Sequence, residues 1–147
     1  MQRLIRAPRA RVYEALLDPD DVARWRFPRD MTCEIHAFDA REGGRVRVSL
    51  TYAATDRAGK THGSTDTYHG RFLRLIRDEL VVEVDAFETD DPELTGEMTM
   101  TFRLGDADGG TQLVATHEGV PRGIPPEDNE AGWADALDRL AGLVERA

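Results

Sequence analysis

The sequence predicts an α+β domain in which a long C-terminal helix lies across one face of an antiparallel sheet. The segment from Asn129 to Arg146 repeats apolar residues at spacings of four, three and four, which places them on one stripe of an α-helix. These stripe residues are Trp133, Leu137, Leu140 and Val144. Upstream of Pro126 the apolar residues alternate mostly with period two, the pattern of half-buried strands. Such a helix can cover the apolar face of the strands, and the space between these two layers is where we expect the function.

The chain opens with a predicted strand at Gln2 to Arg6, followed by two short helices. The first spans Pro8 to Leu17, because a proline suits the first helical position, where its missing N–H would have no partner anyway. The run from Asp18 to Asp21 predicts a second helix start, with Asp18 as the cap and acidic residues at the positive helix end. This second helix carries Trp25 and ends before Pro28.

Six further strands follow, and short turns between consecutive strands predict an antiparallel meander. We expect a polar hairpin loop at Ala54 to Gly63 and a bend or bulge at Gly70, because glycine inside a strand often marks one. With the opening strand, the sheet then has seven strands. The six predicted strands are Met31 to Phe38, Arg45 to Tyr52, Thr65 to Ile76, Leu80 to Phe87, Met98 to Leu104 and Leu113 to His117.

Length and charge limit the classes of function. The 147 residues suit one domain spanning residues 1–147, and the net charge of −9 disfavours nucleic acid and anionic membranes as partners. No apolar run approaches the ~20 residues of a membrane span, and Met1 to Arg11 lacks a signal-peptide core. Cys33 is the only cysteine, so no disulfide can form within the chain. We therefore expect a soluble, cytoplasmic protein.

Signatures of a metal or cofactor site are missing from the sequence. His36, His62 and His69 show no metal-ligand spacing, and there is no phosphate-binding loop, dinucleotide glycine signature or nucleophile elbow. The sequence predicts no metal and no cofactor.

Ligand-binding candidates come from the aromatic and methionine side chains of the predicted sheet and helices. Trp25 and Trp133 can line a cavity or pack in the core at a helix end, and both interpretations remain open. Gly132, inside the last helix, can leave room for a ligand or simply face solvent. Methionine adapts to irregular shapes, so a strand with a methionine-rich face can line a cavity or form ordinary core. The predicted ligand-binding residues are Trp25, Tyr52, Met98, Met100, Phe102, His117, Trp133 and Leu137.

His117 is the one candidate for acid–base chemistry. It shares its strand phase with Leu113 and Ala115, so its imidazole is predicted to point inward. There it can orient a ligand or exchange a proton near neutral pH, or it can simply hydrogen-bond a neighbouring group.

Six short motifs in order resemble one known group of proteins. They are Ala7 to Leu16 (APRARVYEAL), Asp18-Pro19 with Trp25, Asp39 to Gly44 (DAREGG), Gly109 to Leu113 (GGTQL), Thr116 to Gly119 (THEG) and Gly132-Trp133 with Leu137 and Leu140. Together they resemble the SRPBCC (START/birch-pollen-allergen-like) superfamily, in the branch of bacterial homologues of the heat-shock-protein-90 ATPase activator C-terminal domain. The resemblance implies a helix-grip fold, with a seven-stranded antiparallel sheet wrapped around the C-terminal helix. It also implies a cavity for a hydrophobic molecule, with the two short helices at its mouth. The sequence departs from the commonest pattern of this branch at Trp25-Arg26-Phe27-Pro28, where a second tryptophan usually follows the first, and Arg26 places a charge near that entrance.

Three functions are consistent with this interpretation. The first is a protein that holds a hydrophobic or amphipathic small molecule between the sheet and the C-terminal helix. The second is a cyclase, dehydratase or hydrolase that uses the same cavity, with His117 as acid or base. The third is a chaperone-associated interaction protein, which rests on analogy of fold alone. A homodimer through a sheet edge or an exposed helix is also possible.

Overall fold

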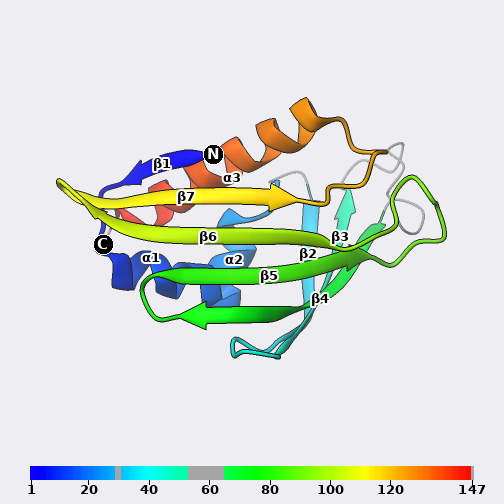
Figure 1. The fold of residues 1–147 in the computed structure, drawn as a ribbon, viewed down its shortest axis with the longest axis horizontal. Coiled ribbons are helices and arrows are strands. Elements are labelled where there is room, and N and C mark those ends of the chain that lie inside the picture. The colour runs from blue at the N-terminus through cyan, green and yellow to red at the C-terminus, as the bar shows by residue number, and fades with distance from the viewer. Residues whose placement is uncertain (29–30, 53–64, 147) are drawn as a thin grey trace.

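The computed structural model describes residues 1–28, 31–52 and 65–146 and shows the predicted order of elements (Figure 1). A strand is followed by two short helices, six strands and a long helix. The elements are β1 (Gln2–Ile5), α1 (Arg9–Leu17), α2 (Pro19–Trp25), β2 (Met31–Phe38), β3 (Arg45–Tyr52), β4 (Thr65–Ile76), β5 (Leu80–Phe87), β6 (Met98–Ala107), β7 (Gly110–Glu118) and α3 (Pro126–Val144). The predicted loop at Ala54 to Gly63 lies outside the described residues.

One antiparallel sheet contains all seven strands, in the order β1-β7-β6-β5-β4-β3-β2. Strands β2 to β7 form the predicted meander, and β1 returns to pair with β7, where Ile5 lies opposite Thr111. In Figure 1 the helices lie behind the sheet, and this arrangement is the α+β helix-grip fold that the sequence predicted.

The helix ends follow local chemistry. Asp18 accepts hydrogen bonds from the backbone N–H groups of Asp20 and Asp21 at 2.8 and 3.2 Å, so the predicted cap of α2 is confirmed. Pro8 precedes α1 as its N-cap residue instead of occupying the first helical position, because its ψ of 153° is extended. Helix α3 begins at Pro126, three residues before the predicted start, because a proline is well accommodated in the first turn.

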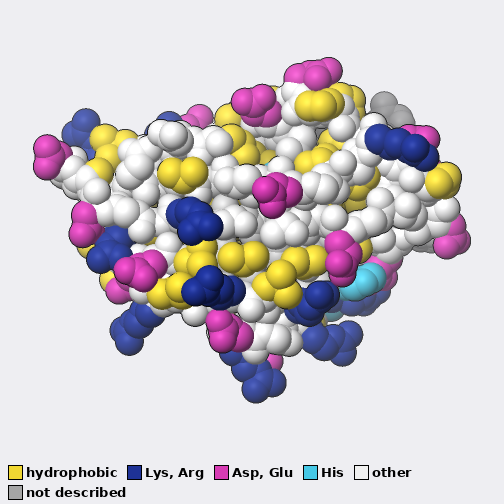
Figure 2. Space-filling model, viewed as in Figure 1, with side chains coloured by type: hydrophobic (Ala, Val, Ile, Leu, Met, Phe, Trp, Pro, Cys, Tyr) yellow, Lys and Arg dark blue, Asp and Glu magenta, His cyan; other side chains and the backbone are white. Residues whose placement is uncertain are grey.

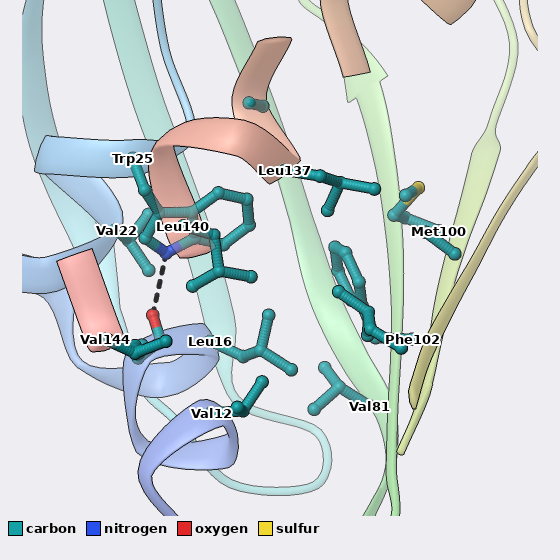
Figure 3. Packing of buried hydrophobic residues seen from close by; sticks show 14 of the residues in the cluster. Val12, Leu16, Val22, Trp25, Val81, Met100, Phe102, Leu137, Leu140 and Val144 are labelled. Atoms are coloured by element: carbon teal, nitrogen blue, oxygen red, sulfur yellow. Dashed lines mark hydrogen bonds between the residues drawn. The ribbon is translucent and has the colours of Figure 1, made fainter. Parts of the chain in front are cut away.

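The core lies between the helices and the inner face of the sheet. The predicted stripe of α3 is confirmed, since Leu137, Leu140 and Val144 are buried and Trp133 is partly buried. Trp25 is 1% exposed, and its indole N–H donates to the carbonyl of Ala15 at 2.8 Å (Figure 3). This bond joins α2 to α1 inside the core.

The opposite face of the sheet is exposed in part to solvent. Charged side chains of both signs are spread over it, with hydrophobic side chains between them (Figure 2). Among the described residues, no helix combines the length and the apolar character that crossing a membrane requires.

Gly70 has a different structural reason from the one predicted. The irregularity in the pairing of β4 with β5 falls between Phe72 and Arg74, whereas Gly70 lies in regular register opposite Asp85. A Cβ atom at Gly70 would overlap with the backbone carbonyl of Val84 and with Oδ1 of Asp85. Glycine is therefore required here by the close approach of β5, and not by a bulge.

We expect Gly70→Ala to lower the free energy of unfolding by about 3 kcal/mol, the upper part of the usual cost of overpacking, because backbone of the adjacent strand has to move. Gly105→Ala on β6 is the matched control, since a Cβ there meets no heavy atom within 4 Å. Urea unfolding followed by circular dichroism measures both variants. Equal stability of the two would contradict the close-approach explanation.

Candidate functional site

A pocket of about 770 Å³ opens between the sheet and the N-terminal half of α3. Strands β2 to β7, the end of α2, the segment before α3 and α3 itself all contribute to its wall. The wall combines apolar side chains with a small group of polar ones. The polar side chains are Arg26, Asp66, Tyr68, Asp85, His117, Asp128 and Asn129.

The structure divides the predicted ligand-binding residues between the pocket and the core. Met98, Met100, His117 and Trp133 line the pocket, on β6, β7 and α3. Trp25, Phe102 and Leu137 lie in the core and not in the pocket wall, because they sit where α2 and α3 pack tightly on the sheet (Figure 3). The side chain of Tyr52 lies outside the described residues.

A row of ring contacts connects the core with the pocket. Trp25 meets Phe102 edge to face at a centroid distance of 6.2 Å, and Phe102 meets Trp133 at 5.9 Å. Trp133 in turn meets His117 at 5.8 Å. Such edge-to-face contacts fix ring orientation, so Trp133 is held by the core on one side while it faces the pocket on the other.

A buried ion pair lies beside the pocket. Both terminal nitrogens of Arg26 donate to Glu83, at 2.9 and 3.0 Å, and the two side chains are only 7% and 1% exposed. The guanidinium carbon also lies 5.5 Å from the ring centroid of Trp133. The predicted charge at the entrance is therefore neutralised inside the protein, because Glu83 reaches it from the inner face of β5. Burial alone would lower the pKa of Arg26, but the charge and hydrogen bonds of Glu83, together with the nearby Tyr68 and Asp85, outweigh burial and raise it.

Asp85 is the second carboxylate of this cluster. Its Oδ2 lies 3.6 Å from Arg26, while its Oδ1 is buried and has no hydrogen-bond partner within the described part of the chain. Burial raises the pKa of Asp85 well above its ordinary value, and the neighbouring charge of Glu83 raises it further. Burial also acts to raise the pKa of Glu83, but the charge of Arg26 and the hydrogen bonds with Asp85 and Arg26 together outweigh burial and lower that pKa. The two shifts favour the proton on Asp85 over Glu83, and Glu83 carries the charge that balances Arg26.

Sequence reasoning missed Glu83 and Asp85, although β5 carried a signal. Val81, Glu83, Asp85 and Phe87 share one phase of a strand that is otherwise apolar. Two acids on the same side of such a strand indicate either a solvent-facing side or a buried polar cluster, and the sequence alone does not distinguish them.

His117 hydrogen-bonds its neighbours, as one of the two predicted interpretations proposed. Its Nδ1 lies 3.1 Å from both Nε1 of Trp133 and Oδ1 of Asn129. Nδ1 can form only one of these hydrogen bonds at a time. It accepts from the indole N–H of Trp133 when it carries no proton, and it donates to the amide oxygen of Asn129 when it carries one. Burial lowers the pKa of His117 even though the Asn129 contact acts to raise it, which favours the neutral ring.

Within the described residues, one group of acids is close enough to share a metal ion. Glu14, Asp18 and Asp21 place carboxylate oxygens within 4.8 Å of one another, on α1 and α2. Asp18 already caps α2 and Asp21 pairs with Arg11 at 2.9 Å, so these carboxylates have structural roles.

Residues 6–145 match the family model described as "Activator of Hsp90 ATPase homolog 1-like protein". A crystal structure of a protein from Chromobacterium violaceum is similar at 36% identity and a TM-score of 0.88, covering 99% of this chain and 94% of that chain. A protein from Rhodobacter sphaeroides (19% identity, TM-score 0.80, 99% and 90% covered) shares the fold. So does the AHSA1-like protein from Aeromonas hydrophila (19%, 0.73, 99% and 90%). Among proteins of curated function, none matches this sequence.

Removing the charge of Glu83 should expose the dependence of the fold on the ion pair. We expect Glu83→Gln to cost about 3 kcal/mol of unfolding free energy, the low end for breaking a buried pair, because Asp85 can ionise and partly replace Glu83. Asp39→Asn breaks the exposed contact of Asp39 with Arg41 and should change stability by less than about 0.5 kcal/mol. Chemical denaturation of both variants checks this, and a similar small effect in both would show that the buried pair is dispensable.

The proton on Asp85 should appear in the pH dependence of stability. The folded state holds this proton above the ordinary aspartate pKa of 3.8, whereas the unfolded chain releases it. Stability of the unmodified protein should therefore fall as pH rises above that value, by at most about 1.4 kcal/mol per pH unit, until the folded pKa is reached. Asp85→Asn lacks this loss, so the stability of the variant relative to the unmodified protein should grow as pH rises above the ordinary aspartate value. Parallel pH profiles would contradict the assignment.

Proposed function

The chain belongs to the family of activator of Hsp90 ATPase homolog 1-like proteins, and from this premise we propose that it binds a small amphipathic molecule in the pocket between the sheet and α3. The pocket itself carries the proposal, because about 770 Å³ is within the range of ligand sites and exceeds the voids left by ordinary core packing.

The chemistry of the pocket wall supports an amphipathic ligand. Met98, Met100 and Trp133 present apolar surface, and the thioether side chains can adjust to an irregular shape. The polar cluster around Asp85 lies on the β5 side of the same wall. A few polar groups in a largely apolar pocket typically fix the orientation of a ligand.

The position of Gly132 supports the proposal that a ligand can enter the pocket from solvent. It is exposed, lies on α3 and lines the pocket, and a Cβ at this position would meet no heavy atom within 4 Å. Glycine inside a helix costs about 1 kcal/mol relative to alanine, so its presence is consistent with space kept for a ligand.

A larger residue at Gly132 should therefore block the pocket without disturbing the fold. We expect Gly132→Leu to weaken binding of the neutral fluorescent probe N-phenyl-1-naphthylamine by at least about tenfold, because the side chain occupies ligand space. Gly142→Leu is the matched control, since Gly142 lies on the same helix, has open space at its Cβ and does not line the pocket. Fluorescence titration measures both affinities, and equal binding by the two variants would place the probe elsewhere.

One observation favours an enzyme as the second candidate. A protonated Asp85 can act as a general acid inside the pocket, and the neutral His117 can accept a proton there. These two groups suit a cyclase, dehydratase or hydrolase. Native mass spectrometry separates the two functions once a ligand is known, because a binding protein returns the molecule unchanged and an enzyme returns a product of different mass.

A further inference from the structure

We propose that the hydroxyl of Tyr68 donates a hydrogen bond to a carbonyl oxygen of the bound molecule, so that the pocket takes ligands with an apolar body and a carbonyl group. The inference rests on the proposed function, because it assigns a ligand class to the same pocket. Three features carry it: the place of Tyr68 in the pocket wall, the open side of its hydroxyl and the cation beside that hydroxyl.

Tyr68 is held in place on the inner face of the sheet. It lies on β4 with Val48 of β3 and Phe87 of β5 as its register partners, and its ring meets that of Phe27 at a centroid distance of 6.5 Å. The residue lines the pocket although it is only 7% exposed. Neighbours on both strands and from the end of α2 restrict the ring, so the position of its hydroxyl is set before a ligand binds.

The hydroxyl of Tyr68 has an open side. It has no hydrogen-bond partner among the described residues. Two polar side-chain atoms in that part of the chain lack a partner and are also closed off from solvent, namely Nε of Arg3 and Oδ1 of Asp85. The hydroxyl of Tyr68 is not one of them, so it keeps accessible surface, and the pocket that this residue lines is where a ligand can reach it.

The surroundings make this hydroxyl a hydrogen-bond donor. Burial raises the pKa of Tyr68 well above its ordinary value of 10.0, although the charge of Arg26 acts to lower it, so the phenol keeps its proton at neutral pH. Among the neighbouring charges, that of Arg26 acts most strongly on Tyr68. A cation attracts the lone pairs of the hydroxyl oxygen, which turns the O–H bond away from the guanidinium and leaves the hydrogen for an acceptor.

Apolar side chains of the same wall receive the rest of such a ligand. Leu50 of β3, Phe87 of β5 and Met98 of β6 all line the pocket. A ligand with a carbonyl group in reach of Tyr68 gains a hydrogen bond, whereas a hydrocarbon of the same shape leaves the hydroxyl without a partner. The hydroxyl therefore discriminates between ligands that the apolar wall accepts equally well.

A matched pair of naphthalenes tests the inference, because 2-acetonaphthone carries a carbonyl group where 2-ethylnaphthalene has a methylene group. Each is titrated against the complex of the protein with N-phenyl-1-naphthylamine, and displacement of the probe gives its affinity. Tyr68→Phe removes only the hydroxyl. We expect this variant to bind 2-acetonaphthone at least about fivefold more weakly than the unmodified protein does, and 2-ethylnaphthalene with a change of less than about twofold.

Tyr13→Phe is the matched control. Tyr13 is partly buried on α1 and does not line the pocket, so loss of its hydroxyl should leave both affinities unchanged. Circular dichroism of the two variants checks that each keeps the fold. A loss of packing in Tyr68→Phe would weaken both naphthalenes alike, whereas a lost hydrogen bond weakens only the ketone.

The hydrogen bond also has a spectroscopic signature. The naphthyl ketone 6-propionyl-2-(dimethylamino)naphthalene emits at longer wavelength when its carbonyl group accepts a hydrogen bond. Bound to Tyr68→Phe, it should therefore emit at shorter wavelength than when it is bound to the unmodified protein. Bound to Tyr13→Phe, it should emit at the same wavelength as in the unmodified protein.

The outcomes separate the inference from the proposed function. If N-phenyl-1-naphthylamine binds and Tyr68→Phe changes the two naphthalenes equally, or changes neither, Tyr68 does not hold a carbonyl group and the inference fails although the pocket binds. Unchanged emission of the bound ketone in Tyr68→Phe overturns it in the same way. If none of the probes binds, the proposed function fails as well.

Discussion

The buried pair of Arg26 and Glu83 is the interaction on which the arrangement of α2 and α3 on the sheet depends. Arg26 ends α2, Glu83 lies on the inner face of β5, and Trp133 of α3 lies against the guanidinium. One side chain thus connects both helical elements with the sheet. A buried pair of this kind adds little net stability compared with apolar packing, but it strongly disfavours arrangements in which either charge is left alone. Its contribution here is therefore to the uniqueness of the structure.

The same pair determines the chemistry of the pocket. One positive charge faces two carboxyl groups, and because Glu83 makes the shorter contacts with Arg26, the pKa of Glu83 is lowered while that of Asp85 is raised. Within the described residues, Oδ1 of Asp85 is left buried without a hydrogen-bond partner. Ring contacts from Trp25 through Phe102 to Trp133 close the other end of the interlayer space. The interior is consequently packed at one end and open at the other.

Family membership and ligand chemistry are separate questions for this fold. The helix-grip arrangement supplies a sheet, a helix and a space between them, and that frame can hold many kinds of molecule. Discrimination comes from a few side chains in the frame. In this chain the pocket wall contains Asp85, Arg26 paired with Glu83, and His117, and the positions of these side chains do not follow from the backbone alone.

The sequence by itself determined the elements, because periodicity and capping act over a few residues. The stripe of α3, the cap at Asp18 and the inward row of Met98 and Met100 were all readable in this way. Tertiary structure decided what depends on distant partners. The pairing of β1 with β7, the core position of Trp25 and the partnership of Arg26 with Glu83, 57 residues apart, required the folded chain. The alternation along a strand places two acids on the same side of it. Only the folded chain shows whether a positively charged side chain, such as Arg26 at the end of α2, lies close enough to form an ion pair with one of them.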